Sequence, residues 1–291
     1  MKYANLHLHS HFSDGVHSPA ELCRRAKETG YRALAITDHE NTASWKELPE
    51  LARAAGLDYI LGFEAYARGL GTSFHITCYD FDRDDKDVVR YFDTLTEIAY
   101  IKTKAKFDSM SASGYLEDLT WQNVLDDAAP DCWLCNEQIF ASMIKRLGKT
   151  QKDYWDYSRE FHKHKTKPEL PFIDLSVEKL IPMIKNAGGF CVVAHPHGQT
   201  KYLPELYALG LAGAEYDHPD IYPEDVSGVL EFAKEHKFYL SGGSDHTGFL
   251  GNEPFIRGDY PGPRPGIPYD SYVYNGVTEE EFYLMKNRIY G

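Results

Sequence analysis

Short apolar runs recur along the first 80 residues and are separated by stretches of mixed polarity. Runs of this length, bounded by glycine or polar residues, predict strands that are buried on both faces. They lie at residues 3–8, 33–36, 59–64 and 73–79. Strands spaced by helix-length segments are typical of α/β folds with parallel sheets.

Helix signals fill the intervals between these runs. Ser18, Pro19 and Glu21 stand at the spacing of an N-cap, a first-turn proline and a capping box. A second helix is expected over 41–55, with Gly56 ending it. The alternation returns late in the chain, with helices expected at 176–186, 202–209 and 223–235 and strands at 190–194, 212–216 and 238–241.

The middle of the chain has a different pattern. Between residues 82 and 168 the sequence is charged and rich in Tyr and Lys, and its apolar residues repeat with helical period. We therefore expect a discontinuous α/β domain over 1–83 and 170–291, interrupted by a helical insertion over 84–169. The Gly- and Pro-rich segment 251–268 is expected to form an ordered surface loop.

Charge and cysteine content narrow the function classes. The formal net charge of −13 argues against a broad surface for duplex nucleic acid. No apolar run approaches the ~18 residues of a membrane span, so no membrane partner is expected. The five cysteines are read mainly as buried thiols, with a redox or zinc role for Cys132 and Cys135 as the alternative. We expect a reduced, cytoplasmic compartment.

Histidines and carboxylates end or follow several predicted strands. His7 and His9 are two residues apart, so both side chains project from one face. The carboxyl ends of parallel strands meet on one side of an α/β fold, where sites are built. Imidazole and carboxylate groups are ligands for zinc, manganese and iron. The chain therefore predicts a multinuclear metal site, although hydrogen-bonded core histidines would explain single motifs, His75 in particular.

Taken together, these motifs resemble the PHP (polymerase and histidinol phosphatase) family, above all its stand-alone metal-dependent phosphoesterases. The resemblance covers just over half the chain. It rests on His7-Leu8-His9-Ser10, Ser13-Asp14-Gly15, Ile36-Thr37-Asp38-His39, Gly62-Phe63-Glu64, His75, Ala187-Gly188-Gly189, Ala194-His195-Pro196 and Gly243-Ser244-Asp245-His246.

The resemblance implies a distorted (β/α)7 barrel of PHP type with a helical insertion, and two to three divalent metal ions (Mn, Fe or Zn). Position by position it assigns one metal to His7, His9, Glu64 and Asp245, a second to Asp14, His39 and His246, and a third to Glu64, His75 and His195. Glu64 would bridge two of them.

Two departures from the family pattern concern individual residues. Asp245 and His246 are adjacent, whereas the family usually has one residue between them. Adjacent side chains on a strand point apart, so either the backbone bends or His246 contacts substrate. In the insertion, Gln138 stands where the family often has a phosphate-facing histidine.

The expected activity is hydrolysis of a phosphomonoester by metal-activated water. The expected substrate is a small phosphorylated one: a nucleoside mono- or bisphosphate or a short oligonucleotide. The alternatives are a sugar- or histidinol-phosphate phosphatase and a non-catalytic metal-binding scaffold. His197 or His246 is expected to protonate the leaving group. Candidate substrate residues are His17, Gln138, Lys102 and Arg146. For Lys102 and Arg146, solvated helix charges are the favoured explanation.

Overall fold

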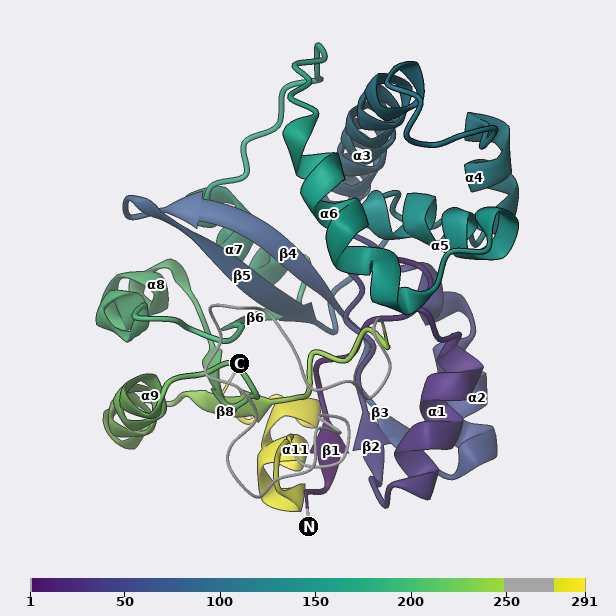
Figure 1. Ribbon diagram of the computed structural model, residues 1–291. Helices are drawn as coiled ribbons and strands as arrows, with labels where there is room; N and C mark the ends of the chain where they lie inside the picture. Colours follow the sequence, from purple (N-terminus) through teal and green to yellow (C-terminus); the bar gives the residue numbers. More distant parts are fainter. Residues whose placement is uncertain (1, 249–274, 291) are drawn as a thin grey trace.

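Strands of two hydrogen-bonded sheets form the centre of the molecule (Figure 1). The computed structural model describes residues 2–248 and 275–290, so the loop expected at 251–268 lies outside the described residues. The first sheet contains β1 (Ala4–Asn5), β2 (Ala33–Leu34) and β3 (Asp58–Tyr59), all parallel. The second contains β4 (Gly62–Gly69), β5 (Thr72–Tyr79), β6 (Phe190–Val193), β7 (Gly213–Asp217) and β8 (Tyr239–Gly242).

One strand departs from the parallel arrangement that the strand–helix alternation suggests. β5 runs antiparallel to both β4 and β6, whereas β6, β7 and β8 are parallel. A two-residue turn at Leu70 and Gly71 joins β4 to β5, with φ values of 52° and 79° at these residues. Positive φ at both central positions is the geometry that suits a tight hairpin. Periodicity reports burial and not strand direction, so this feature was not predictable from it.

Backbone hydrogen bonds connect the two sheets. Beyond β1 and β8, the Asp245 N–H donates to the carbonyl of His7 and the His9 N–H donates to the carbonyl of His246, at 2.9 and 3.1 Å. On the other side, the Glu64 N–H donates to the carbonyl of Asp38 at 3.1 Å. Gly243 permits the first junction, because a Cβ there would lie 2.4 Å from the His7 backbone nitrogen. These junctions bring the segments that carry the predicted ligands together.

The helices of this part of the molecule largely follow the predicted signals. Helix α1 (Pro19–Glu28) is capped by Ser18, whose Oγ accepts the Glu21 N–H at 3.2 Å. The helix expected over 41–55 is instead a 3₁₀ turn, η1 (Ala43–Lys46), followed by α2 (Leu48–Ala55). Pro49 explains the break, since it lacks the N–H needed to continue a ladder and suits a helix's first turn. The remaining helices are η3 (Thr200–Tyr202), α7 (Val177–Asn186), α8 (Leu203–Leu209), α9 (Pro223–Glu235) and α11 (Glu279–Lys286).

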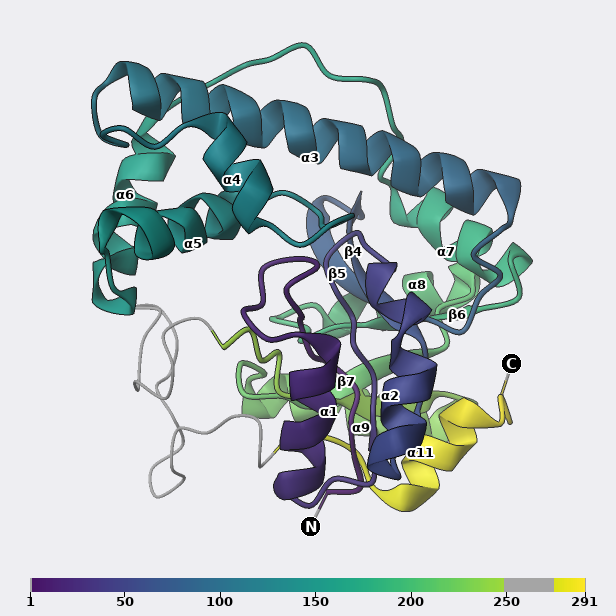
Figure 2. The same ribbon diagram turned by 90° about the vertical axis from the view of Figure 1, so that its right-hand side faces the viewer.

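A second group of helices lies together on one side of the strands (Figures 1 and 2). It comprises α3 (Lys86–Ala112), α4 (Trp121–Asp127), α5 (Asn136–Leu147), η2 (Gln151–Asp153) and α6 (Tyr154–Lys163). The four α-helices of this group share an apolar cluster that includes Phe107, Phe140 and Tyr157. The first half of α3 belongs to a different cluster, in which Val88 packs in the same core as Phe63 of β4. The chain is thus a mixed α/β fold whose long helix α3 bridges two apolar cores.

None of the helices in the described ranges has the length and apolar character needed to cross a lipid bilayer.

Candidate metal centre

The carboxylate of Glu64 lies at the centre of a ring of imidazoles. Glu64 is near the start of β4 and is only 1% exposed. Its Oε1 atom is 2.8 Å from His75 Nδ1 and 3.1 Å from His195 Nε2. Its Oε2 atom is 3.3, 3.3 and 3.2 Å from ring nitrogens of His7, His9 and His39. Five imidazoles from separate parts of the chain therefore converge on one buried carboxylate.

Two aspartates extend this cluster. Asp245 Oδ1 is 2.9 Å from His9 Nε2, and Asp14 Oδ1 is 3.3 Å from His9 Nδ1. Asp14 also approaches His39, with Oδ2 3.8 Å from its Nε2. Asp245 has a φ of 52°, so the backbone turns there through the left-handed region. That bend places the aspartate carboxylate beside the histidines that follow β1.

Side chains in the described ranges form four overlapping groups whose ligand atoms lie within 4.8 Å of one another. They are His7, His9, Glu64 and Asp245; His9, Asp14 and His39; His39, Glu64 and His75; and His7, His195 and His218. The first group coincides with the first predicted metal site. The third contains Glu64 and His75 of the third predicted site, and His195 contacts the same Glu64 oxygen as His75 does.

Several nitrogen and oxygen atoms that could bind a metal lack hydrogen-bond partners among the described residues. They are His7 Nε2, His9 Nδ1, His9 Nε2, Glu64 Oε2 and His218 Nε2, all buried. Burying polar atoms without partners costs about 1–3 kcal/mol each. Divalent cations would satisfy the atoms of His7, His9 and Glu64, and mixed imidazole and carboxylate ligands suit zinc, manganese or iron. The residues present therefore fit the metals that the sequence predicts.

Sequence reasoning missed Glu215, a buried carboxylate in β7. Its Oε1 accepts a hydrogen bond from His7 Nδ1 at 2.9 Å, and its Oε2 accepts one from the backbone N–H of His195 at 2.8 Å. A carboxylate that accepts from one ring nitrogen leaves the other nitrogen's lone pair free for a metal. Glu215 thus orients His7 toward the cluster. The available signal was a glutamate inside an otherwise apolar strand.

His218 was also missed. It follows β7 and is fully buried, and its ring centroid lies 4.9 Å from that of His195 and 5.6 Å from that of His7. Its Nε2 is 3.7 Å from Asp245 Oδ2. The signal in the sequence was a histidine followed by Pro219 at a strand end, the same pattern as His195 and Pro196.

Burial and the attraction between imidazoles and carboxylates together set the protonation states of the cluster. Burial opposes the ionisation of Glu64, but the surrounding imidazoles, His39 foremost, outweigh it and hold its pKa well below the usual value. Burial likewise opposes charge on His9, but Asp14, Asp245 and Glu64 together raise its pKa to about 9. For His218, burial prevails and lowers the pKa to about 3.

His246, the predicted ligand of the second metal, lies apart from the four geometric groups. The backbone does bend at Asp245, yet the two adjacent side chains still diverge, and His246 joins none of the four groups formed by the described residues. The His246 ring instead stacks on that of His17, with centroids 5.4 Å apart and planes at 8°. His9 takes its place beside Asp14 and His39.

Two predicted substrate residues have structural partners. Arg146 forms a pair of hydrogen bonds with Asp127, at 2.5 and 2.9 Å, which ties α5 to α4. Gln138 accepts the Cys135 N–H at 2.7 Å, and its amide nitrogen donates to the carbonyl of Ser13. The Arg146 guanidinium and the Gln138 amide thus bind other groups of the protein. These contacts do not support a phosphate contact for either residue.

The loop before α5 lies against the cluster. The Trp133 N–H donates to the carbonyl of Phe12 at 2.8 Å, and the Trp133 ring lies 5.7 Å from the ring of His39. Asn41 and Lys46 both bond to Asp131, at 2.8 and 2.7 Å. These contacts place one half-buried aromatic ring from the helical segment beside a predicted metal ligand.

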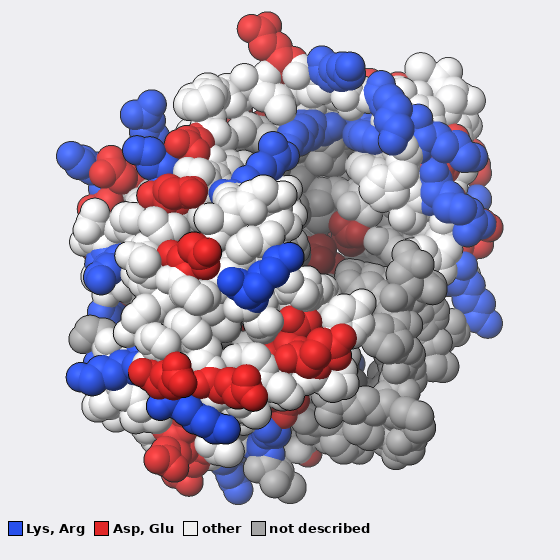
Figure 3. All heavy atoms as spheres, turned by 90° about the vertical axis from the view of Figure 1, so that its left-hand side faces the viewer, with Lys and Arg blue, Asp and Glu red and all other residues white. Residues whose placement is uncertain are grey.

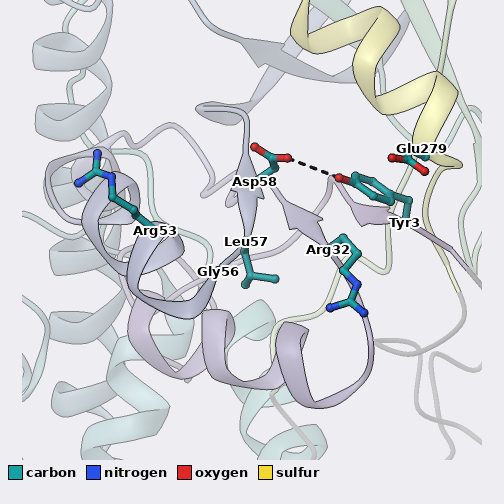
Figure 4. Close-up of a pocket in the computed structure, with 7 residues that line it drawn as sticks. All are labelled: Tyr3, Arg32, Arg53, Gly56, Leu57, Asp58 and Glu279. Carbon is teal, nitrogen blue, oxygen red and sulfur yellow. Dashed lines mark hydrogen bonds between the residues drawn. The ribbon is translucent and has the colours of Figure 1, made fainter.

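The surface also contains a depression far from this chemistry. It is lined by Tyr3, Arg32, Arg53, Asp58 and Glu279, among others, and lies near the start of strands whose far ends carry the cluster. Figure 4 shows the two arginine side chains pointing away from each other.

The face in Figure 3 is hollowed, with acidic side chains inside the hollow and Lys and Arg along its upper and right-hand edge.

Comparison with known proteins gives a family and a set of relatives. A model of the PHP domain matches residues 5–195. The chain is similar to the phosphoribosyl 1,2-cyclic phosphate 1,2-diphosphodiesterase of Eggerthella lenta, with 25% identity over 87% of this chain and 97% of that protein. It is also similar to the 5'-3' exoribonuclease of Haemophilus influenzae, with 26% identity over 84% and 89% of the two chains.

A third relative is the 3',5'-nucleoside bisphosphate phosphatase of Chromobacterium violaceum, with 25% identity over 84% of this chain and 87% of that protein. Among solved structures, a Bifidobacterium adolescentis protein provisionally described as a metal-dependent phosphoesterase superposes with a TM-score of 0.78. The match covers 99% and 96% of the two chains at 24% identity, which establishes a common fold.

We predict that Glu64→Gln weakens manganese binding by about 10- to 100-fold, because the amide removes the charge toward which five imidazoles converge. Metal content after dialysis against dilute Mn²⁺, measured by mass spectrometry, provides the readout. Glu28→Gln on the exposed end of α1 is the matched control. Equal metal content in the two variants would count against a central role for Glu64.

We further predict that metal uptake releases protons at pH 7.5. The His9 pKa of about 9 means that this imidazole is protonated in the metal-free protein, and coordination requires its lone pair. Titration calorimetry in buffers of different ionisation enthalpy should show release of about one proton or more per chain. By the same pKa, His9 stabilises the metal-free fold fully below pH ~6.5, and this contribution is lost as the pH rises through about 9. Uptake without proton release would contradict this assignment.

Proposed function

This chain belongs to the PHP family, and from that premise we propose that it is a metal-dependent hydrolase of phosphate esters acting on nucleotides. The observation that carries the proposal is the Glu64-centred cluster, in which buried imidazole and carboxylate atoms face one another without hydrogen-bond partners. Bound divalent cations would activate water and offset the charge of phosphoryl oxygens. The three relatives are named for activity on a phosphoribosyl cyclic phosphate, on RNA and on 3',5'-nucleoside bisphosphates.

The proposal includes a closed, distorted (β/α)7 barrel over 1–83 and 170–291, with residues 84–169 as an inserted helical cap. The backbone hydrogen bonds between His7 and Asp245, between His9 and His246, and between Glu64 and Asp38 support closure. The separate apolar cluster of α3 to α6 supports a cap with its own core. The packing of Val88 with Phe63 indicates that the cap is anchored through the first half of α3.

Within this proposal the first metal would be held by His7, His9, Glu64 and Asp245, and a second by His9, Asp14 and His39. A third would be held by Glu64, His75 and His195. Glu64 would contribute to more than one, which fits the contacts that both of its oxygens make. We therefore propose two to three cations, with Mn, Fe or Zn all compatible with these ligands.

The contacts of the two candidate proton donors argue against either ring as the acid. His197 Nε2 lies 2.6 Å from the carbonyl of Asp220, which can only accept, so this nitrogen carries the ring's proton and donates a hydrogen bond there. His246 stacks on His17, a candidate substrate residue, and burial lowers the pKa of His246 to about 3, so its ring is neutral near pH 7. We propose that a neutral His246 contacts the substrate, that His17 supports its ring, and that water supplies the proton to the leaving group.

Lys102 remains a proposed phosphate partner. The hydrogen bond from Arg68 is the main cause that lowers the pKa of Tyr66, and the positive charge of Lys102 lowers it further. The Tyr66 ring lies 6.0 Å from that of His75, so this interaction supports a position for Lys102 on the side of α3 nearer the cluster. A small anionic substrate would be drawn by such charges, while duplex nucleic acid and membranes are not proposed as partners. We also propose a cytoplasmic location for the protein.

The test of the proposal is release of inorganic phosphate by protein that has been stripped with a chelator and reloaded with Mn²⁺. Nucleoside monophosphates and 3',5'-bisphosphates should be hydrolysed, and a chelator should abolish turnover reversibly. Faster turnover of histidinol phosphate would favour the amino-alcohol alternative. Bound manganese without turnover of any phosphomonoester or dinucleotide would favour a metal-binding scaffold.

We predict that Trp133→Ala raises KM for a nucleoside 5'-monophosphate by about 5- to 100-fold, because the base loses a stacking partner beside His39. KM for ribose 5-phosphate, which has no base, should change by less than about twofold. Trp133→Phe should retain most of the affinity, and Trp155→Ala on α6 is the control. The same loss for both substrates would show that Trp133 supports the site and does not stack a base.

A further inference from the structure

His218 combines a buried ring with an unusual hydrogen-bond arrangement. The Asp220 backbone N–H donates to His218 Nδ1 at 3.1 Å, across the turn at Pro219. A neutral imidazole has one N–H and one lone pair. Because the lone pair of Nδ1 accepts from the backbone, the ring proton must lie on Nε2. The buried Nε2 is therefore an N–H donor, and it has no acceptor among the described residues.

The neighbouring His7 has the opposite arrangement. Its Nδ1 faces the carboxylate of Glu215 at 2.9 Å, so the proton lies on Nδ1 and the lone pair of Nε2 points into the cluster. His7 is thus set up as a metal ligand, whereas His218 is not. For His218 to bind a cation through Nε2, the ring would have to lose the Asp220 hydrogen bond or become an imidazolate. The fourth geometric group therefore does not function as a metal site.

The position of this N–H points to an oxygen atom that comes with the substrate. Nε2 lies 3.7 Å from Asp245 Oδ2, which is too far for a hydrogen bond. The rings of His195 and His7 flank it, at centroid distances of 4.9 and 5.6 Å. Phosphoryl oxygens can only accept hydrogen bonds. A phosphoryl group held at the cluster would bring such an oxygen to the Nε2 side of the His218 ring, where the N–H has no acceptor among the described residues.

We propose that His218 is a neutral hydrogen-bond donor to a phosphoryl oxygen of the substrate. This inference rests on the proposed function and adds a residue to it. His218 transfers no proton, since its Nδ1 stays bonded to the backbone throughout. Its contribution is a fixed dipole aimed at the charge of the phosphoryl group, in a site where the N–H of the neighbouring His7 faces Glu215 instead.

Two substitutions separate the possibilities. His218→Asn retains an acceptor for the Asp220 N–H but lacks a donor at the position of Nε2. His218→Gln can place an amide N–H near that position. With the manganese-loaded full chain, calorimetry with inorganic phosphate should show about 10- to 100-fold weaker binding for the Asn variant and recovery to within about fivefold for Gln. Metal content should equal that of the wild type in both variants.

Loss of a bound ion in both variants would overturn the proposal, because it would make His218 a ligand. Unchanged phosphate affinity in the Asn variant would overturn it as well. Nitrogen NMR of the zinc-loaded wild type requires no variant: it should show a neutral, Nε2-protonated ring, and any other form contradicts the proposal. If the wild type binds phosphate but hydrolyses no ester, the proposed function fails while the phosphate measurement still decides the role of His218.

Discussion

The burial of Glu64 constrains most of what surrounds it. A carboxylate that is removed from water costs several kcal/mol unless other groups compensate it. Here compensation comes from five imidazoles that reach it from the ends of β1, β2 and β6 and from the middle of β5. The strand junctions and the hairpin at Leu70 bring these rings to one carboxylate, and the bend at Asp245 adds a second carboxylate beside them.

The groups behind the ligands decide what each imidazole can do. Glu215 accepts from His7 and leaves a metal-facing lone pair, while a backbone N–H donates to His218 and leaves a proton facing the site. Two rings of the same residue type, 5.6 Å apart, thus have opposite chemical roles. By distance alone, both rings would count as equivalent metal ligands. The hydrogen-bond partner of each Nδ1 atom is what distinguishes their roles.

Much of the centre was predictable because its signals are local. His7 and His9 stand two apart at a strand end, and His39, Glu64 and His195 each close an apolar run, so periodicity and residue type were sufficient. The resemblance to a known family supplied the grouping into metal sites. The antiparallel direction of β5 was not predictable in this way, yet it is what lets His75 reach Glu64 from the middle of a strand.

Other features depend on long-range contacts that no local pattern encodes. Arg146 has the positive charge and the N–H groups of a phosphate ligand but is paired with Asp127 from a neighbouring helix. Gln138 is held by the loop around Ser13, and Trp133 comes to lie beside His39 through a docked loop. Glu215 and His218 each have an ordinary explanation in isolation. Their roles emerge only when the strand that carries them is placed next to His7 and His195.

The central claim is that Glu64 is shared by several bound cations. Anomalous diffraction from crystals of the manganese-loaded protein would test it most directly. The account predicts at least two manganese peaks that both have a Glu64 carboxylate oxygen among their ligands, with His218 outside the coordination sphere of each. Manganese peaks that do not involve Glu64, or no peaks at the cluster at all, would contradict it.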